Sequence, residues 1–274
     1  MSTLIMGIVN VTPDSFSDGG RFVDPDAAIA HGLLLRSQGA HILDVGGEST
    51  RPGSERVSPR VEQERVLPVV RALADAGAAV SVDTMNASTA LAAVEAGARI
   101  VNDVSGGLAD PDLLAAVAST DADLAIGHWR GPSTDMYARA EYEDVVHEVL
   151  RELSERVEAA AAAGIPPARV IVDPGIGFGK KGAQNWDVLR ALPRIAGLGH
   201  RVLVGTSRKR FLAEVLSADA EDEVSQPRRD LATAVTSVLS AQAEAWAVRV
   251  HDVAGTRDAL RIADEWWRPA ARRG

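Results

Sequence analysis

Short apolar runs alternate with longer amphipathic stretches along this chain, and no other feature of the sequence constrains its fold as strongly. Runs that are apolar on both faces are typical of buried parallel strands, and the stretches between them suit connecting helices. The predicted strands begin at Leu4, His41, Ala79, Arg99, Asp123, Arg169, Arg201 and Ala247. Eight strand–helix units in 274 residues predict an α/β protein with a closed TIM (β/α)8 barrel rather than an open sheet.

Residues 1–274 are expected to form a single domain, because no Pro- or Ser-rich linker divides the sequence. Hydrophobic residues make up 46% of the chain, enough for a large core, whereas aromatic residues contribute 4%. That core must therefore consist mainly of Ala, Val, Leu and Ile. The predicted helices include 25–38, 59–76 and the Ala-rich segment 137–163, and residues 268–274 are expected to be a frayed tail.

The chain lacks cysteine and carries a formal net charge of −9. The missing thiols exclude disulfides, thiolate catalysis and Cys-ligated metal centres. An acidic protein repels nucleic acid and anionic membranes, so we expect neither as a partner, although a local cluster of cations would still hold small anionic substrates. The sequence shows no signal peptide and no apolar run near the ~20 residues of a membrane span, which predicts a soluble, cytoplasmic protein.

Almost every predicted strand ends in a polar residue, and a barrel brings all of these ends to one rim. Strand ends are often polar simply because loops begin there, so each residue alone is weak evidence. The set as a whole predicts a ring of site residues at this rim. Its members are Asn10, Asp44, Asp83, Asn102, Asp103, His128, Asp173, Ser207, His251 and Asp252.

Two loops and one strand end carry groups suited to anions. The segment Asn10–Gly20 is longer than ordinary strand–helix connections, which predicts a mobile lid. The segment Gly46–Ser54 combines hydroxyls and Arg51 with glycines that let backbone N–H groups approach an anion. Arg249 and His251 are two residues apart on the last strand and therefore share a face, where they would suit a phosphate or diphosphate.

The sixth predicted strand ends in the sequence DPGIGFGKKG. Asp173 comes at its end, the glycines leave room for a flat ligand against the backbone, and Phe178 is available for stacking. Lys209 follows the seventh strand and would lie near Asp173 at the same rim. This pair could form either part of a ligand site or a plain salt bridge.

These segments resemble the dihydropteroate synthases, the sulfonamide-target enzymes of folate biosynthesis. The matching motifs appear in order over roughly residues 6–253: MGIVNVTPDSFSDGG, DVGGESTRPG, VSVDT, VNDVSGG, DPGIGFGK, GTSRKRFL and RVHDV. The resemblance implies an enzyme that joins 6-hydroxymethyl-7,8-dihydropterin diphosphate to p-aminobenzoate. The products would be 7,8-dihydropteroate and pyrophosphate, formed by an SN1-like path, and we further expect a homodimer.

The resemblance also implies a role for each polar group of the rim. Asp83, Asn102 and Asp173 would hold the pyrimidine edge of the pterin, with Lys209 over its ring system. The diphosphate would meet the side chains of Asn10, Arg249 and His251, with Mg²⁺ bridging Asn10 and phosphate oxygens. The aminobenzoate site would consist of Phe16, Thr50, Arg51, Pro52 and Phe178. The catalytic groups would be Asp173, Lys209, Arg249 and His251.

One departure from the family pattern follows the fifth predicted strand. The family usually has Leu-Met-His-Met after the fifth strand, whereas this chain has Ile126-Gly127-His128-Trp129. Gly127 would leave a gap near the pterin that Trp129 could fill, so a paralogue that binds pterin with little or no turnover stays open. A pterin-dependent methyltransferase domain is the other alternative, but it needs neither the SFSDGG loop nor the SRK and RVHDV groups that are present here.

Overall fold

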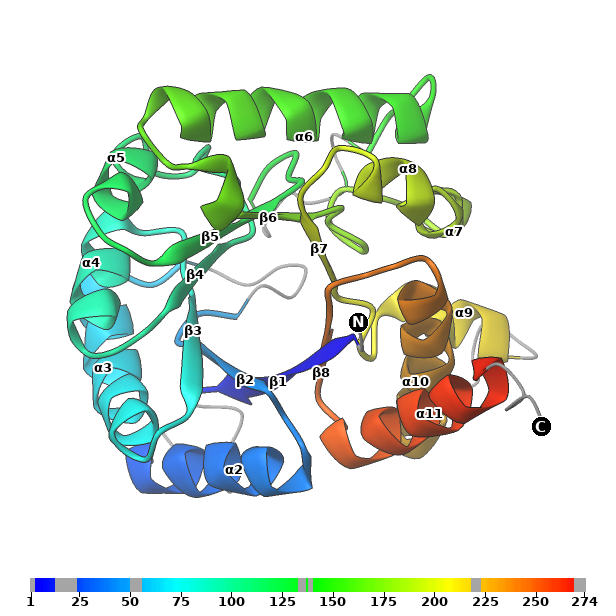
Figure 1. The fold of residues 1–274 in the computed structure, drawn as a ribbon, viewed down its shortest axis with the longest axis horizontal. Helices are drawn as coiled ribbons and strands as arrows, with labels where there is room; N and C mark the ends of the chain where they lie inside the picture. The colour runs from blue at the N-terminus through cyan, green and yellow to red at the C-terminus, as the bar shows by residue number, and fades with distance from the viewer. Residues whose placement is uncertain are drawn as a thin grey trace, which may run out of the picture.

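The computed structural model describes residues 3–12, 24–49, 56–132, 137, 140–217 and 223–268. Within these ranges, parallel strands form one closed barrel in chain order and the helices surround it (Figure 1). The strands are β1 Leu4–Asn10, β2 Ile42–Gly46, β3 Ala79–Asp83, β4 Ile100–Asp103, β5 Asp123–Gly127, β6 Val170–Asp173, β7 Arg201–Val204 and β8 Ala247–Val250. The predicted TIM barrel is confirmed.

The helices follow the strands as the alternating pattern predicted. They are α2 Pro25–Gln38, α3 Pro59–Asp75, α4 Ala87–Glu95, α5 Leu113–Ala118, α6 Val145–Ala162, α7 Ala183–Arg190, α8 Leu192–Ala196, α9 Arg210–Leu216, α10 Gln226–Gln242 and α11 Val253–Trp267. A short 3-10 turn, η2 Pro167–Arg169, precedes β6. Among the described residues, no helix is both long and apolar enough to cross a membrane.

The predicted helix 137–163 is wrong at its beginning, because α6 begins at Val145. Asp144 adopts extended backbone angles, and its carboxylate accepts hydrogen bonds from the N–H groups of Val146 and His147. Such a cap fixes the first turn of a helix. The residues before it lead back to the barrel rim, where the Tyr142 hydroxyl donates to the Gly179 carbonyl at 2.9 Å.

The barrel interior changes from apolar to polar between one inward-facing residue of a strand and the next, two positions further along. One buried layer of side chains fills the centre: Met6, Ile42, Ile100, Ala125, Ile171, Leu203 and Ala247. Because alternate residues of a strand point to the same face, the residues two positions further along also point inward. These include Asp44, Asn102, Gly127, Asp173 and Arg249. The same strands therefore supply both the packed floor of the barrel and the polar groups above it.

Candidate active site

A hydrogen-bonded group of four side chains crosses the barrel above the apolar layer. Arg249 on β8 donates from Nε to Asp44 Oδ2 at 2.6 Å and from Nη2 to Asp83 Oδ2 at 2.7 Å. Asn102 Nδ2 donates to the same Asp44 oxygen at 3.1 Å, so the amide oxygen of Asn102 stays available as an acceptor. The structure thus joins side chains from β2, β3, β4 and β8 by contacts that the sequence did not predict.

Asp83 has an unusual electrostatic environment. Its burial raises the pKa of its carboxyl group, the Arg249 guanidinium opposes that rise, and the nearby Asp44 carboxylate adds to it. Asp44 itself is fully buried, and its Oδ1 has no hydrogen-bond partner among the described residues. Arg249 therefore compensates two buried carboxylates at once.

Asp173 and Lys209 lie on the opposite side of the mouth, at the ends of β6 and β7. Asp173 Oδ1 accepts from the Gly175 N–H at 2.7 Å. Burial raises the pKa of Asp173, and the charge of Lys209 opposes this rise. Burial lowers the pKa of Lys209 to about 8, with Asp173 acting against it.

No direct ion pair joins Lys209 to Asp173, although the structure describes both residues. The Lys209 ammonium donates instead to the Ile176 carbonyl and lies 4.4 Å from the centroid of the Phe178 ring, a cation–π geometry. The plain salt bridge left open by the sequence is thus absent. Lys209, Asp173 and Phe178 form one wall of the mouth.

His251 lies beside Ser207. The Ser207 hydroxyl oxygen accepts from the His251 backbone N–H at 3.1 Å and lies 2.8 Å from His251 Nδ1. The Arg249 side chain extends toward β2 and β3.

A buried lysine was not predicted as part of this site. Lys180 is 1% exposed, and its ammonium contacts the Gly175 carbonyl at 2.9 Å, the Phe178 carbonyl at 3.1 Å and His128 Nδ1 at 2.9 Å. His128 Nε2 in turn lies 2.9 Å from Glu152 Oε2. In the sequence Lys180 stands next to Lys181, and neither composition nor spacing distinguishes the buried lysine from the exposed one.

Several predicted site residues have fewer described contacts. Asn10 ends β1, is half-buried, and its side chain makes no hydrogen bond to the described residues. Four of the residues predicted for the aminobenzoate site lie outside the described residues. These are Phe16, Thr50, Arg51 and Pro52.

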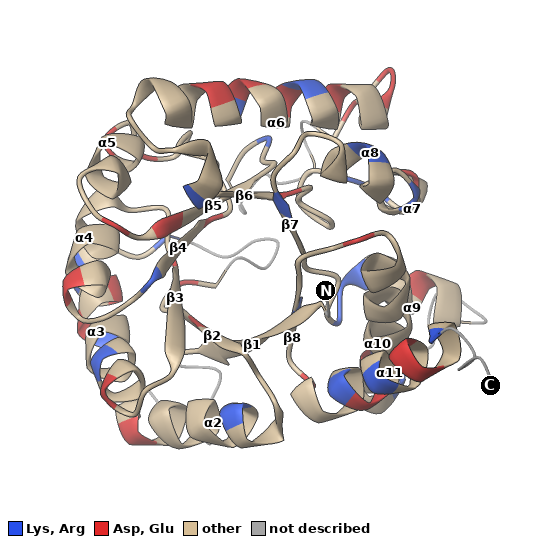
Figure 2. Cartoon of the chain, viewed as in Figure 1, with Lys and Arg blue, Asp and Glu red and all other residues tan. Residues whose placement is uncertain are grey.

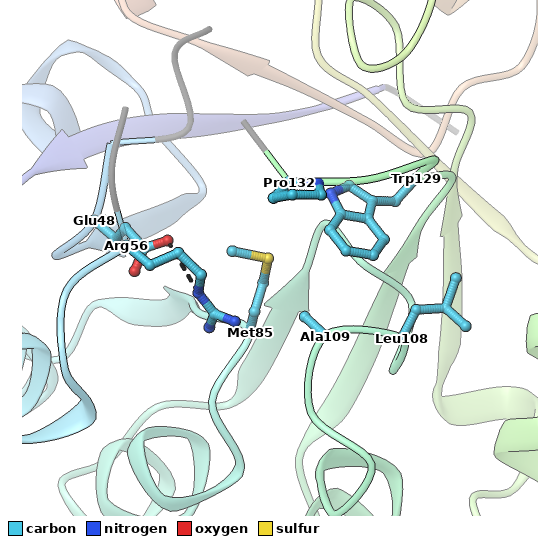
Figure 3. A pocket seen from close by; sticks show the side chains of 7 residues that line it. All are labelled: Glu48, Arg56, Met85, Leu108, Ala109, Trp129 and Pro132. Atoms are coloured by element: carbon cyan, nitrogen blue, oxygen red, sulfur yellow. Dashed lines mark ion pairs between the residues drawn. The ribbon is translucent and has the colours of Figure 1, made fainter. Parts of the chain in front are cut away.

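The expected gap at Gly127 is wrong. Gly127 is paired with Asp173 in the sheet, and a Cβ atom there would lie 2.6 Å from the Val104 Cα atom. The backbone of Val104 therefore occupies the space that a larger side chain would need. Trp129 does not fill this space; it lines a cavity of about 260 Å³ at the rim, together with Met85 (Figure 3).

This cavity has an apolar side and a charged side. Figure 3 shows the Glu48–Arg56 ion pair, with an N–O distance of 3.6 Å, facing an apolar group. The remaining lining residues are Met85, Leu108, Ala109, Trp129 and Pro132. The cavity thus lies at the ends of strands β2 to β5, away from the Ser207–His251 pair.

Known proteins are similar to this chain in both fold and sequence. The pterin binding enzyme family matches residues 6–251. The dihydropteroate synthase of Mycobacterium leprae is 50% identical over 264 residues, which cover 96% of this chain and 93% of that protein. The Xanthomonas albilineans dihydropteroate synthase, solved with 4-aminobenzoic acid, has 44% identity and a TM-score of 0.89, covering 98% of this chain and 94% of its own. Its structure in complex with 7,8-dihydropteroate gives 41% identity and a TM-score of 0.85, covering 98% and 95%.

The barrel and its polar mouth, matched over most of the chain, define the class of protein. This chain belongs to the pterin-binding enzyme family. Within that family it belongs to the dihydropteroate synthases, which are transferases of folate biosynthesis. The resemblance stated from the sequence motifs is confirmed.

Proposed function

We propose that this chain condenses 6-hydroxymethyl-7,8-dihydropterin diphosphate with p-aminobenzoate to give 7,8-dihydropteroate and pyrophosphate. The observation that carries the proposal is the set of inward-facing acceptors Asp83, Asn102 and Asp173 at or next to the carboxyl ends of β3, β4 and β6. The pyrimidine edge of a pterin presents a ring N–H and an exocyclic amine, and paired oxygen acceptors suit those donors. The Xanthomonas structures, with 4-aminobenzoic acid and with 7,8-dihydropteroate, support this choice of second substrate and product.

Arg249 serves the diphosphate in this proposal without leaving its carboxylate partners. Its Nε and Nη2 donate to Asp44 and Asp83, whereas Nη1 makes no hydrogen bond to the described residues. A guanidinium has five N–H donors, so Nη1 can take a phosphate oxygen while the two ion pairs persist. His251, which follows Arg249 at the end of the same strand, supplies a second polar group for the diphosphate.

The chemistry of the reaction indicates a role for each of these side chains. An arylamine is neutral and nucleophilic at pH 7, so the difficult step is departure of pyrophosphate from the pterin methylene. Arg249 and His251 stabilise the negative charge that develops on the departing oxygen as the carbon–oxygen bond breaks. Asp173 and Asp83 stabilise positive charge on the pterin, which favours an SN1-like path. The amine nitrogen then bonds to the methylene and loses its proton to solvent.

A Mg²⁺ ion fits the groups at the diphosphate end. Asn10 offers an amide oxygen with no hydrogen bond to the described residues, and Mg²⁺ prefers one or two protein oxygens together with substrate phosphates. The described part of the chain contains no group of three or more His, Asp or Glu side chains able to hold a metal alone. When bound, Mg²⁺ would draw charge from the leaving pyrophosphate. Asn10 would hold the ion against the diphosphate.

The aminobenzoate site stays a prediction for most of its residues. Phe178 is the described member, and its ring lies against the Lys209 ammonium at the mouth. The other predicted members, Phe16, Thr50, Arg51 and Pro52, lie outside the described residues, in the segments that follow β1 and β2. Closure of those loops would exclude water from the cationic methylene carbon.

A second copy of the chain is the partner that the surface supports. Helices α10 and α11 lie side by side on the outside of the barrel (Figure 1). Along α10, Leu231, Val235 and Leu239 are 66%, 52% and 53% exposed, and their spacing of four residues places them on one face. On α11, Ile262 and Trp266 are 73% and 83% exposed. We infer that this apolar face, α10–α11, is buried between two protomers of a homodimer.

The proposal also covers the kind of partner, the domain organisation and the location of the protein. Acidic and basic residues are interspersed on outer helices such as α6 and α11 (Figure 2), and the net charge is −9, which supports small-molecule substrates rather than nucleic acid. We also propose that residues 1–274 form one domain and that the protein is cytoplasmic. Cell fractionation with an antibody against the chain tests that location.

Release of pyrophosphate is the deciding measurement. The purified chain, supplied with pterin diphosphate, p-aminobenzoate and Mg²⁺, is expected to release one pyrophosphate for each dihydropteroate formed. An inactive pterin-binding paralogue would bind pterin in calorimetry and release none. A methyltransferase domain would likewise bind a pterin but would not require p-aminobenzoate. Either outcome would overturn the proposed function.

A further inference from the structure

Lys180 is buried next to the candidate active site but is not among the residues that would touch a substrate. Its side chain is 1% exposed, and a lysine ammonium is almost never this buried unless it is fully paired. Two of its partners are the backbone carbonyl oxygens of Gly175, at 2.9 Å, and Phe178, at 3.1 Å. The ammonium therefore ties together two positions of the loop that follows Asp173.

That loop carries one group of the proposed site, Phe178, and contacts two others, Asp173 and Lys209. Asp173 Oδ1 accepts from the Gly175 N–H at 2.7 Å, so the position of Gly175 sets the orientation of the carboxylate. The carbonyl of Ile176 receives the Lys209 ammonium, and the ring of Phe178 lies 4.4 Å from that ammonium. A shift of this loop would move the pterin acceptor, the cation and the aromatic ring together.

The loop has no regular secondary structure to hold its shape. Gly175 and Gly177 have φ angles of 64° and 81°, which only glycine adopts without strain. Asn185 from α7 accepts the Gly177 N–H at 2.7 Å, and a Cβ atom on Gly175 would collide with the His128 carbonyl oxygen. The Phe178 N–H donates to the Gly175 carbonyl at 2.9 Å within the loop. Side-chain hydrogen bonds add to this turn, three with Asn185 and two with Lys180.

The third partner of Lys180 connects the loop to helix α6. Burial lowers the pKa of Lys180 to about 7. In its charged form the lysine can only donate, so His128 Nδ1 then accepts at 2.9 Å and the imidazole proton lies on Nε2, facing Glu152 Oε2 at 2.9 Å. Burial lowers the pKa of His128 to about 4, so the ring is neutral at pH 7. Arg130 donates to both Glu152 and Glu148, so it holds the Glu152 end of the Lys180–His128–Glu152 hydrogen-bonded chain in place.

We propose that Lys180 is a positioning residue for the pterin and aminobenzoate sites. Its three N–H donors, directed at Gly175, Phe178 and His128, hold the carboxylate of Asp173 and the ring of Phe178 in place. The substrates named for this role rest on the proposed function, whereas the contacts of Lys180 do not depend on it. Arg249, Ser207 and His251 belong to other strands, so the diphosphate end of the site does not depend on Lys180.

The test compares Lys180→Met with Lys181→Met. Methionine keeps the length of the lysine side chain but donates no hydrogen bond, and Lys181 is the exposed neighbour in the same loop. Calorimetry should show that Lys180→Met loses about tenfold or more in affinity for a bare pterin, while its affinity for pyrophosphate stays within about twofold. Its KM for p-aminobenzoate should rise, and Lys181→Met should equal the parent chain. Unchanged pterin affinity, or equal losses for pterin and pyrophosphate, would overturn the positioning role.

Hydrogen exchange gives a reading that needs no ligand. The amides of residues 175–178 should exchange faster in Lys180→Met than in Lys181→Met, and equal rates would overturn the proposal. If Lys180→Met does not fold, Lys180→Gln keeps two N–H donors, and its pterin affinity should fall by a smaller factor. An unchanged affinity in Lys180→Gln overturns the proposal in that case. If the parent chain releases no pyrophosphate, the proposed function is wrong. The role of Lys180 is then still decided by the hydrogen-exchange comparison.

Discussion

Arg249 Nη2 on β8 donates to Asp83 Oδ2 on β3, across the interior of the barrel, at 2.7 Å. The same guanidinium donates to Asp44 through Nε, so a single cation compensates two carboxylates that are both buried. A pterin acceptor and a phosphate donor are therefore one connected unit. Substitutions at either residue must affect stability as well as binding.

Arg249→Ala tests this connection. Removing the cation leaves Asp44 and Asp83 buried and facing each other, and breaking such a pair typically costs about 3–5 kcal/mol of stability. Burial already raises the pKa of Asp83. Its carboxyl therefore takes up a proton more readily in the folded chain than in the unfolded chain, and the variant's stability should fall as pH rises through that raised pKa. Thermal unfolding between pH 5 and pH 8 measures this, and a loss that did not depend on pH would contradict it.

The double variant Arg249→Ala/Asp83→Asn separates stability from binding. With one carboxylate neutralised, most of the lost stability should return. Affinity for pyrophosphate with Mg²⁺ should not return, because the Nη1 donors are still missing. Calorimetry that found pyrophosphate affinity restored would show that Arg249 supports the barrel and does not bind the diphosphate.

Asp173→Asn should weaken pterin binding with the fold intact. The amide replaces one acceptor by a donor that faces a pterin donor, and losing a charged hydrogen bond in a buried site costs about 1.5–3 kcal/mol, roughly ten- to a hundredfold in affinity. Calorimetry with a bare pterin measures the loss. Asp123→Asn is a suitable control, since Asp123 pairs with Arg201 at the opposite end of the barrel at 2.9 Å. Equal affinities for the two variants would remove Asp173 from the pterin site.

Ser207→Ala should change the anion end of the site alone. The hydroxyl accepts from the His251 N–H and contacts Nδ1, so its loss removes a contact that orients the imidazole. Pyrophosphate affinity should fall several-fold, whereas affinity for a bare pterin should not change. Isothermal titration with both ligands on the same preparation decides, and a parallel loss of both affinities would contradict the assignment.

Gly127→Ala should destabilise the barrel. The new Cβ would lie 2.6 Å from Val104 Cα, so one backbone must shift, and overpacking of this kind costs about 1–3 kcal/mol. Gly205→Ala is the matched control, because a Cβ there meets Arg249 Cβ at 3.8 Å, an ordinary contact. The melting temperature should fall by several degrees in the first variant only. Comparable melting temperatures would mean that the segment around Val104 moves freely.

Val235→Glu should disrupt the homodimer. A charge in the middle of the α10–α11 face would be buried against its own copy, since Val235 is 52% exposed in the single chain. Sedimentation equilibrium should find a dimer for the parent chain and a monomer for the variant. Leu91→Glu on α4, across the barrel from that face (Figure 1), should stay dimeric. A monomeric parent chain would overturn the dimer itself.

The sequence predicts the barrel well because each strand can be recognised from its own short apolar run, and eight such runs can be counted along the chain. The same period of two places Arg249 on the inner face, but it does not reveal that the guanidinium reaches β2 and β3. That reach depends on which acceptors lie opposite in the closed sheet. The beginning of α6 was predicted too early because Ala-rich composition marks helix interiors, whereas the capping carboxylate of Asp144 decides where this helix begins.

Lys180 shows a further limit. In the sequence it is one of two adjacent lysines after glycines, and either one fits a solvated loop. Which lysine is buried depends on the φ angles of Gly175 and Gly177 and on the position of His128, a residue from another strand. Tertiary contacts of this kind leave no trace in local periodicity.

The two-residue step inside the barrel restricts how this enzyme can change over time. Ile171 fills the floor and Asp173 faces the mouth, and the residue between them, Val172, packs outward against the helices. Deleting or inserting one residue in a strand would exchange inward and outward side chains, burying a carboxylate under a helix and placing an aliphatic group in the mouth. Length variation should therefore be confined to the connections, and new substrate preferences should arise by point substitution within strands of constant length.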